Sequence, residues 1–582
     1  MFRKLIADEI AKVVPGGTGF SVEVPETAEH GDYASNAALV LAKKEGKNPL
    51  EMAEKLALRL RSGQLSRFCD KVEIAGPGFL NFFIASSILT SSLWGKSVKN
   101  NSHELFPNKS FFKRLFLKKK IVIVEYFQLN IAKRPHVGHM RSAIIGDALK
   151  RMFIEAGYKA ISDTHVGDWG TQFGILLLEY KDLEPHMRHE IFSQGDPFEK
   201  LENMYISGNE NIKREASRLE LAKREFAKLE LGDIENRKLW KEMVDISMKN
   251  LEKSAKLLNL LPFDEHRGES SYEKDMPLIV QEALQKGVAQ KKDDGAVVVD
   301  LSDEGLGEAV LIKSDGASTY LLRDLATIRY RKEKYDFYKN IYVVDMRQGY
   351  HFGQVFEVAK KLGYAKEEEI YEDVLHISYG IVKLPEGTMS TRAGNVISIE
   401  AMVSEAQNRA YKVIEEKNSK LKNKNEIARM VGLGAIKYFD LSHNRKTNIE
   451  FDWDRALSFE GNTGPYLQYT YARLRSILRK HGKSKIKEIF RDDIDSEERQ
   501  ILLSISRFDE ELERALINYY PHVLADYLYV LAQKTNEFYH SHPILQENDQ
   551  EKKQFRLALI SKISETLKKG LYLLGIDAPE EM

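Results

Sequence analysis

Short apolar runs alternate with helical patterns through the middle of the chain. The run IVIVEY, residues 121–126, is β-branched and almost continuously apolar, which is typical of a strand buried in a parallel sheet. After it, an apolar residue recurs every fourth position, which predicts a helix that ends near Gly157. The residues of that face are Met140, Ile144, Ala148 and Met152. Later strand candidates are residues 160–166, 295–301, 340–346 and 374–382. This alternation predicts an α/β fold with a mostly parallel sheet, whose ligands lie at the carboxyl ends of the strands.

The alternation of strands and helices is confined to the middle of the chain. The patterns on either side differ from it and divide the chain into three predicted domains. Residues 1–110 combine helical patterns with two strands around a Gly-Pro-Gly turn in residues 71–85, which predicts a small α+β domain. Residues 111–435 hold the predicted sheet, interrupted at about residues 181–259 by a charged helical insertion. Residues 436–582 show amphipathic helical patterns and predict an all-helical bundle.

Composition is that of an ordinary globular protein. The chain has 582 residues, 43% of them hydrophobic and 30% charged. A single cysteine, Cys69, excludes an internal disulfide, and acidic residues near the start argue against a signal peptide, so we expect a cytoplasmic location. No apolar run approaches the roughly 20 residues that cross a bilayer, so we expect no membrane role. One cysteine and scattered histidines also do not make a usual zinc cluster, and we expect no metal centre.

Charge adds little to this description. Lysine plus arginine equals aspartate plus glutamate, at 87 residues each. This balance argues against a protein coated in nucleic acid, but it permits local basic faces. Residues 479–487 are one such cluster, and from charge alone a solvated loop explains them better.

The most informative short motif lies where the first predicted strand gives way to a helix. His136 and His139 are three positions apart with Gly138 between them, so both imidazoles would face out of the first helical turn. Free backbone N–H groups and the positive end of the helix dipole favour an anion there, and glycine lets a flat ring or a phosphate approach closely. Two ordinary histidines beside a turn explain so short a motif equally well.

Longer segments surround this motif. They are VEYFQLNIAKRPHVGH, HVGDWGTQFG, FDEHRGES, KSDGASTYLLRDLAT, MSTRAGN, GNTGPYLQY and the terminal LGIDAPEEM, preceded by HGDYASNAALVLAKK and AGPGFLNF. In this order they resemble the arginine-specific family of class I aminoacyl-tRNA synthetases over nearly the whole chain. The resemblance implies a Rossmann-like catalytic domain with a helical insertion, an N-terminal domain that recognises the D-loop of tRNA, and a C-terminal anticodon-binding domain.

The resemblance also implies a reaction and the residues that handle ATP. Members of this family join arginine to the α-phosphate of ATP, with Mg²⁺, and then pass the arginyl group to the 3′ end of tRNA(Arg). His136 and His139 would donate to the phosphates, and Gly138 would lie under the adenine. The phosphate loop of the class maps to residues 388–392, where Met389, Ser390 and Arg392 would contact ATP. Both lysines usual in this loop are missing, and Lys133, at a position where family members carry a lysine, would replace them.

The substrate side chain demands a different kind of pocket. A guanidinium has five donors and no acceptor, so its pocket should offer carboxylates and other oxygens. The arginine-binding positions of the family correspond to Glu125, Asn130, Tyr320, Asp324 and Gln348. Taken singly, Asp324 also fits a surface pair and Tyr320 a core residue. Family members usually have a small polar pair and a proline before Asn130, whereas this chain has Phe127, Gln128 and Leu129. The resemblance therefore does not determine the conformation of this loop.

Contacts with tRNA follow from the same resemblance. Phe79 and Asn81 match positions that read the D-loop, while Tyr466, Tyr469, Tyr539 and Met582 match positions at the anticodon loop. Aromatic faces suit unstacked RNA bases, although each tyrosine also fits a helix core. We therefore expect tRNA(Arg), L-arginine and ATP as partners of a monomer that activates arginine only when tRNA is present.

Two other functions fit parts of the sequence. A small-molecule nucleotidylyltransferase would share the histidine motif and the sheet, but it would lack the helical bundle predicted for residues 436–582. A catalytically inactive relative that binds RNA would be expected to lose the histidines or the carboxylates that face the guanidinium, and all of these are present.

Overall fold

The computed structural model describes residues 2–93, 99–100, 103–104, 120–368, 371–383, 397–482 and 486–582. The chain forms two compact units, and each is built from segments that are far apart in the sequence. Unit 1 consists of Met1–Leu115, Phe459–Leu571 and Ala578–Met582, and unit 2 consists of Phe116–Ser458 and Tyr572–Asp577. The predicted domain boundary at residue 435 lies inside a helix of unit 2. Unit 2 continues beyond this boundary to Ser458.

The N-terminal part of unit 1 is an antiparallel sheet with helices, so the predicted α+β arrangement is confirmed. β4 (Phe79–Ile84) lies between β2 (Tyr33–Ser35) and β3 (Cys69–Ala75), with β1 (Val22–Glu23) at one edge. The other elements are α1 (Phe2–Val13), α2 (Ala37–Glu45), α3 (Pro49–Arg61), α4 (Ser86–Leu93), β5 (Lys99–Asn100) and β6 (His103–Glu104). The Gly-Pro-Gly turn joins β3 to β4, where Gly78 has a φ of +130° that favours glycine.

The C-terminal part of unit 1 is all helical, as predicted. Its helices are α18 (Gly464–His481), α19 (Ser496–Ser506), α20 (Phe508–Ile517), α21 (Pro521–Ser541) and α22 (Gln550–Leu573). α21 packs against α18, α19 and α20. Leu524, Leu528 and Ala532 of α21 are fully buried and recur every fourth position, because one face of an amphipathic helix is turned to the core.

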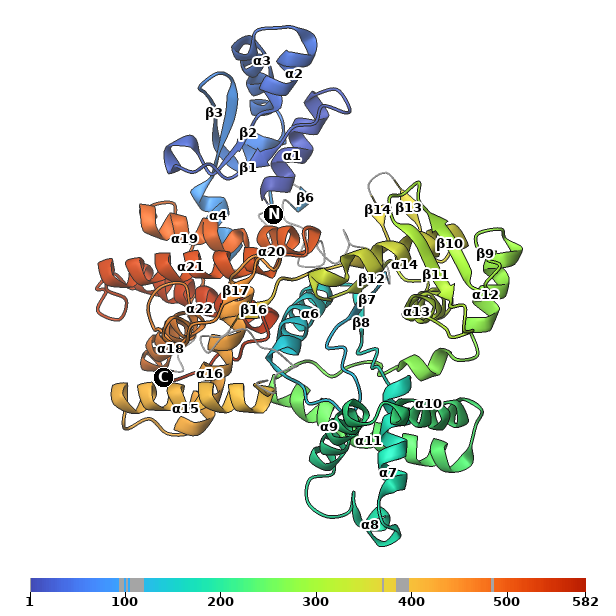
Figure 1. Ribbon diagram of the computed structural model, residues 1–582. Helices are drawn as coiled ribbons and strands as arrows, with labels where there is room; N and C mark the ends of the chain where they lie inside the picture. Colours follow the sequence, from blue (N-terminus) through green and yellow to red (C-terminus); the bar gives the residue numbers. More distant parts are fainter. Residues whose placement is uncertain are drawn as a thin grey trace. The chain divides into compact units, whose positions relative to one another are not determined.

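A four-stranded parallel sheet forms the centre of unit 2, which confirms the predicted α/β fold (Figure 1). The strand order is β15 (Val374–His376), β12 (Lys339–Tyr342), β7 (Ile121–Glu125), β8 (Lys159–Asp163). The apolar run that predicted β7 is explained by its interior place in the sheet, where Val122, Ile123 and Val124 are at most 1% exposed. At the carboxyl edge the last residues of the four strands are in register: His376, Tyr342, Glu125 and Asp163.

One strand candidate lies outside this sheet, and another contributes to it only in part. Residues 295–301 were expected in the α/β alternation, but β10 (Val297–Leu301) pairs antiparallel with β11 (Gly307–Ile312) and β9 (Gln290–Lys291). An apolar run identifies a strand without identifying its partners, which explains this error. The candidate at residues 374–382 contributes β15 and also β16 (Val382–Lys383). β16 pairs with β17 (Ile449–Glu450), a strand too short to leave a periodic pattern in the sequence.

Helices account for most of the rest of unit 2. α6 (Val137–Ala156) follows β7 and packs on β7 and β8 (Figure 1). α8 (Pro185–Glu190), α9 (Pro197–Arg214), α10 (Ser217–Glu230) and α11 (Ile234–Leu257) fall within the predicted helical insertion, after α7 (Thr171–Asp182). The remaining elements are η3 (Glu269–Tyr272), α12 (Met276–Gln285), α13 (Tyr320–Tyr335), η4 (Met346–Gln348), α14 (Gly349–Leu362), β13 (Glu367–Glu368), β14 (Tyr371–Glu372), α15 (Ile399–Lys417), α16 (Lys424–Leu441) and α17 (Trp453–Ala456).

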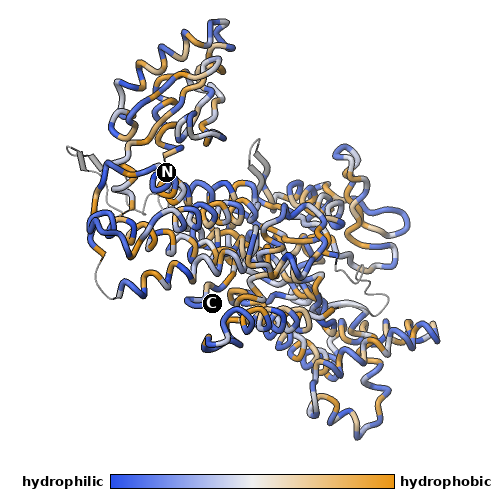
Figure 2. Tube along the Cα trace, turned by 90° about the vertical axis from the view of Figure 1, so that its left-hand side faces the viewer, coloured by the Kyte–Doolittle hydropathy of each residue, from blue (hydrophilic) through white to orange (hydrophobic). Residues whose placement is uncertain are grey.

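Hydrophilic and hydrophobic residues are interspersed along the helices of both units (Figure 2). In the described ranges, none of the helices combines the length and the apolar character that a membrane span requires.

Candidate active site

α6 begins at the two histidines of the sequence motif. Nδ1 of His136, the residue before the first turn, accepts a hydrogen bond from the backbone N–H of Gly138 at 3.0 Å. Nδ1 of His139 accepts in return from the backbone N–H of His136 at 3.2 Å. The two rings lie together with their centroids 3.9 Å apart. The histidines thus cap the helix reciprocally, in the way that Ser or Thr and Glu usually do.

The caps fix the tautomer and charge of both imidazoles. A ring nitrogen that accepts from a backbone N–H carries no proton, so each neutral ring has its proton on Nε2. Burial and the charges of His136 and Lys133 lower the pKa of His139 to about 3. Burial and Lys133 also lower the pKa of His136. The positive end of α6 therefore offers two neutral N–H donors, which suits the binding of a phosphate.

Gly138 is needed for this cap. A Cβ at Gly138 would lie 2.7 Å from Cε1 and 2.9 Å from Nδ1 of the His136 ring. No side chain fits there while His136 caps the helix. Gly138 is also exposed, so its backbone is open to a flat ligand, as the expected adenine contact requires.

The first turns of α6 are held firmly by their surroundings. A Cβ on Gly146 would lie 2.2 Å from Cγ of Tyr126, so the tyrosine ring packs directly on the helix backbone. Arg141 is 1% exposed, and its Nη1 donates to the carbonyl oxygens of Gly380 at 2.6 Å and Thr447 at 2.8 Å. The histidine donors therefore stand on a rigid element, which favours preorganised binding.

Two cations precede the histidine pair in the linker from β7. Arg134 is bound to Glu202 of α9, with Nε 2.9 Å from Oε2. Lys133 is exposed, and its Nζ lies 5.4 Å from the centroid of the Tyr205 ring. Its charge contributes to the lowered pKa values of His136 and His139. Met389, Ser390 and Arg392, the expected ATP contacts of the phosphate loop, lie outside the described residues.

Glu125, an expected substrate ligand, is engaged by an arginine of the chain itself. Nη2 of Arg331 lies 2.6 Å from Oε2 of Glu125 and 2.8 Å from Oδ2 of Asp163. Nη1 of Arg331 donates to Oδ1 of Asn340 at 3.1 Å. Glu125 is 3% exposed and Arg331 is fully buried. Sequence reasoning did not single out this arginine, which stands in the charged run RYRKEKY.

Asp324 of α13 lies between two histidines that sequence reasoning also missed. Its Oδ2 is 2.6 Å from Nε2 of His351 on α14, and its Oδ1 is 3.8 Å from Nε2 of His165 in the loop after β8. Burial by itself would lower the pKa of His165, but the charges of Glu125, Asp324 and Asp163 together raise it. His165 is therefore a buried imidazole among carboxylates.

The other three expected arginine ligands are exposed. Tyr320 is the first residue of α13 and is 67% exposed. Gln348 ends η4, three residues before His351, and Asn130 lies in the loop after β7. A Cβ on Gly167 would lie 2.2 Å from Oδ1 of Asn130, so this glycine of the HVGDWG segment lets the two loops approach.

Residues 127–129, where the sequence differs from the usual family pattern, pack into the core. Phe127 has a φ of +61°, is fully buried and packs against Phe263 with ring centroids 6.5 Å apart. The backbone N–H of Phe127 donates to Oγ of Ser142 on α6 at 3.0 Å. Nε2 of Gln128 donates to Oε1 of Glu125 at 3.2 Å. This loop therefore ties Glu125 to α6.

Further perturbed carboxyl groups line the same region. Burial raises the pKa of Glu269 in η3 to about 7, although Nη1 of Arg323 lies 3.1 Å from it. Burial also raises the pKa of Asp168, which accepts hydrogen bonds from the backbone and hydroxyl of Ser270 at 2.8 and 2.6 Å. The HVGDWG segment contains both Asp168 and His165, but nothing in its spacing indicated that they would meet η3 and α13.

Comparison with known proteins assigns the chain to a family. The family model for the catalytic domain of class I tRNA synthetases (R) matches residues 103–453. Models for the arginyl-tRNA synthetase N-terminal domain and the DALR anticodon-binding domain match residues 1–84 and 467–582. The chain belongs to the arginyl-tRNA synthetase family.

Individual relatives agree along the whole length. The chain is 38% identical over 570 residues to the arginine–tRNA ligase of Fusobacterium nucleatum, covering 96% of this chain and 95% of that protein. It is 36% identical over 593 residues to the ligase of Clostridium kluyveri, with both chains fully covered. Among solved structures, Thermus thermophilus arginyl-tRNA synthetase has a TM-score of 0.82 at 27% identity, with both chains fully covered. The Plasmodium falciparum enzyme shares the fold, with a TM-score of 0.84 at 24% identity over 100% of this chain and 98% of that one.

The two residues predicted to contact the D-loop differ in exposure. Phe79 is 39% exposed at the start of β4. Asn81 is 3% exposed, because its strand runs between β2 and β3. Phe79 therefore presents an open ring, whereas Asn81 is covered by its own unit. Met582, matched to the anticodon loop, is the last residue and is half-buried.

The three tyrosines matched to the anticodon loop lie on α18 and α21. Tyr469 is 42% exposed. The hydroxyl of Tyr466 accepts a hydrogen bond from Nδ2 of Asn536 at 2.9 Å, and the guanidinium of Arg473 lies 3.9 Å from the ring centroid of Tyr539. Tyr469 is thus the most open of the three rings, while Tyr466 and Tyr539 also join the two helices.

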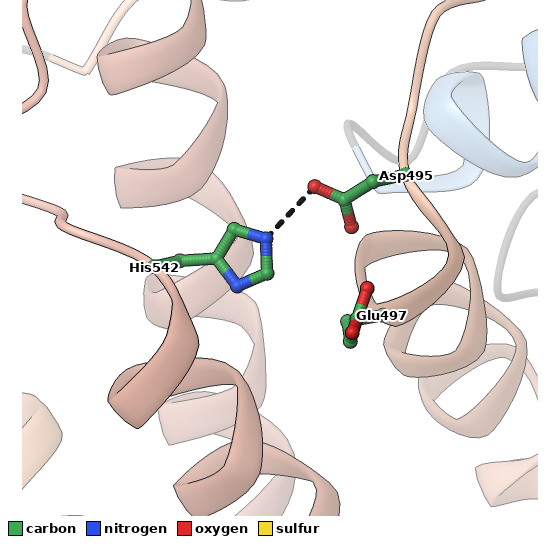
Figure 3. A group of neighbouring side chains, drawn as sticks. All are labelled: Asp495, Glu497 and His542. Carbon is green, nitrogen blue, oxygen red and sulfur yellow. Dashed lines mark hydrogen bonds and ion pairs between the residues drawn. The ribbon is translucent and has the colours of Figure 1, made fainter.

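One group of possible metal ligands occurs in the described part of the chain, and an arginine side chain lies next to it. Figure 3 shows Asp495, Glu497 and His542, whose ligand atoms lie within 4.8 Å of one another. Oδ1 of Asp495 accepts the backbone N–H of Glu498 at 2.9 Å as the cap of α19, and Oδ2 lies 2.9 Å from Nε2 of His542. The buried guanidinium of Arg556 lies 3.6 Å from the same Oδ2. These contacts explain the group as a joint between α19 and α21.

Proposed function

We propose that this arginine–tRNA ligase activates L-arginine with ATP at the carboxyl edge of the β7–β8–β12 sheet and then charges the 3′ end of tRNA(Arg). The observation that carries the proposal is the pair of Nε2–H donors at the start of α6, immediately after the strand that ends in Glu125. An anion site and a cluster of carboxylates thus stand at one sheet edge, where ligands of parallel α/β folds bind.

The residues would divide the work as follows. His136 and His139 donate to the phosphates and to the charge that develops when pyrophosphate leaves. Gly138 makes room for the adenine, and Mg²⁺ arrives with ATP. Asp324 receives the guanidinium, with Tyr320 beside it as a second oxygen acceptor. Asn130 and Gln348 would orient the rest of the amino acid, while Glu125 supports the pocket through its contact with Arg331.

Lys133 would supply the cation that residues 388–392 lack. Lys133 is exposed and its charge acts on the histidine pair, whereas Arg134 is held by Glu202. Met389, Ser390 and Arg392 complete the proposed ATP contacts. Lys133→Ala should slow adenylate formation by about 10² to 10³, the usual scale for one preorganised donor. Lys241→Ala, which changes an exposed lysine of α11, is the matched control and should leave the rate unchanged.

The three matched regions suggest three functional parts: residues 1–110 for the D-loop, 111–458 for catalysis and 459–582 for the anticodon, with the second boundary moved from residue 435 to the end of unit 2. Phe79 and Tyr469 would stack on RNA bases, and Tyr466, Tyr539, Asn81 and Met582 would shape those surfaces. We also propose that the protein acts as a cytoplasmic monomer, because one chain carries all three regions. Analytical ultracentrifugation at micromolar concentration should then give a single species of the monomer mass.

Charging assays with purified tRNA test the function directly. Labelled arginine should enter the tRNA(Arg) acceptor end, while lysine and citrulline should be used at least about 10⁴-fold less efficiently, since they leave buried polar groups unpaired. Comparable charging with lysine would contradict the proposal. Asp324→Asn should weaken arginine use and leave ATP binding nearly unchanged, because it alters only the guanidinium side of the pocket.

A further inference from the structure

Both oxygens of Asp324 face an imidazole nitrogen. His351, from α14, approaches Oδ2 at 2.6 Å, and His165, from the loop after β8, lies 3.8 Å from Oδ1. The side chain of Asp324 is 16% exposed and that of His351 is 28% exposed, so solvent and small solutes reach this carboxylate. In the state described by the structure, the position where a guanidinium would bind Asp324 is thus shared with two titratable rings.

The negative charges of the neighbouring carboxylates, Glu125 and Asp163, are partly compensated by an arginine instead of by histidines. Arg331 is the fixed cation of Glu125 and Asp163, with its Nη2 within 2.8 Å of both. One guanidinium next to two carboxylates leaves one negative charge uncompensated, and Asp324 adds another. In the electrostatic surroundings of His165, the carboxylates outweigh the effect of burial and raise its pKa. The charged and titratable groups around the two histidines are Glu125 on β7, Asp163 on β8, Asp168 in the loop, Glu269 in η3, and Asp324 and Arg331 on α13, with the Tyr272 ring 6.0 Å from His165.

We propose that His165 and His351 determine the specificity of the arginine pocket by holding a proton next to Asp324, which the guanidinium of arginine displaces into solvent when it binds. This inference rests on the proposed function, and it adds two residues and a linked proton to the site.

The displacement follows from the charge and shape of the substrate. The guanidinium of arginine stays protonated at all relevant pH values, and its fork pairs best with both oxygens of a carboxylate. Its arrival places a second cation next to an imidazolium in a partly buried site, where like charges repel more than in bulk water. The imidazole releases its proton and remains as a neutral neighbour. Citrulline is neutral and cannot drive this exchange, so it meets a carboxylate that is already paired.

The sign of the pH dependence is fixed by this exchange. Below the pKa of His165, lowering the pH stabilises the protonated free pocket and therefore weakens arginine binding. With one proton released, the dissociation constant of arginine should rise about tenfold per pH unit on the acidic side. Above that pKa His165 is already neutral, and the affinity should be independent of pH.

Calorimetry of arginine binding to the full-length protein measures the proton directly. Titrations at pH 6.0, 7.0 and 8.5 in buffers of different ionisation enthalpy should reveal release of about one proton at the lower pH and almost none at the highest. His351→Gln and His165→Gln keep an amide donor near the position of Nε2 but do not titrate. At least one of them should abolish proton release and flatten the pH profile of the arginine KM, with kcat at pH 8.5 changed less than KM.

His186→Gln, an exposed histidine on α8, is the matched control and should behave like the wild type. Arginine binding by the wild type without proton release between pH 6.0 and 8.5 would overturn the inference even if neither glutamine variant folded. Retention of wild-type proton release in both folded variants would also overturn it. The proposed function would still stand in both cases, since arginine would bind; it fails separately if no arginyl-tRNA forms at any pH.

Discussion

Nδ1 of His139 accepts the backbone N–H of His136, which leaves Nε2–H as the donor of each neutral ring of the pair. One nitrogen of each ring thus serves the helix cap and the other remains available to a ligand. Because the two roles belong to different atoms, substitutions can separate the structural contribution of these histidines from their contribution to catalysis.

The first prediction concerns His136. In His136→Asn the carboxamide oxygen can replace Nδ1 as acceptor for the Gly138 N–H, but no group remains at the Nε2 position. Stability to urea should therefore stay near wild type, whereas His136→Ala should lose about 1 kcal/mol. Both variants should slow adenylate formation in rapid-quench experiments by about 10² to 10³. A wild-type rate of adenylate formation for His136→Asn would mean that His136 only caps the helix.

The second prediction concerns pH and His139, whose pKa is lowered to about 3 by burial, His136 and Lys133. The unfolded chain binds a proton near pH 6.5, whereas the folded protein does not, so this neutral histidine costs stability as the pH falls below about 6.5. Its contribution is fully present above that pH and is lost progressively toward pH 3. His139→Asn should therefore lose less stability than the wild type between pH 7.5 and 5, measured by urea unfolding. Equal slopes for the two proteins would show that His139 is not buried in its neutral form.

The third prediction concerns the internal ion pair of Arg331 with Glu125 and Asp163. Arg331→Met leaves two buried carboxylates without their cation and should destabilise the protein by about 3–5 kcal/mol. Arg329→Met, on the same helix with its side chain 26% exposed, is the control and should cost less than about 1 kcal/mol. Equal effects of the two substitutions on chemical unfolding would mean that the buried pair has no special energetic weight.

The fourth prediction concerns the contact between α6 and Tyr126. Gly146→Ala places a methyl group 2.2 Å from Cγ of Tyr126, so the ring or the helix must move. Overpacking of this kind should cost about 1–3 kcal/mol and reduce adenylate formation, because α6 carries the histidine donors. Gly16→Ala, where a Cβ meets open space, is the control and should change stability by less than about 0.5 kcal/mol. Wild-type activity and stability in Gly146→Ala would mean that α6 can shift its position on the sheet without loss of function.

Local patterns predicted the elements of the fold better than their partners. The interior strand β7 and helix α6 were correctly predicted, because burial on both faces and a one-sided apolar stripe leave clear periodicities. β10 was assigned to the wrong sheet, because its apolar run carries no information about pairing, and two-residue strands such as β17 leave no pattern.

The candidate site shows the same limit. His136, Gly138 and His139 are neighbours in the sequence, so their spacing suggested an anion site, although it fitted two ordinary histidines equally well. Arg331, His165 and His351 meet the expected ligands only through the fold, from α13, a loop and α14. Arg331 in particular lies in a run of charged residues, yet it is fully buried.

Pyrophosphate exchange tests the central claim most directly. The wild-type protein, mixed with ATP, labelled pyrophosphate and each amino acid in turn, should catalyse exchange with arginine and only when tRNA(Arg) is added. Lysine and citrulline should give no exchange above background, and Asp324→Asn should abolish most of the arginine-dependent signal. Exchange driven equally well by lysine, or unaffected by Asp324→Asn, would contradict the assignment of this carboxylate as the receptor for the guanidinium of arginine.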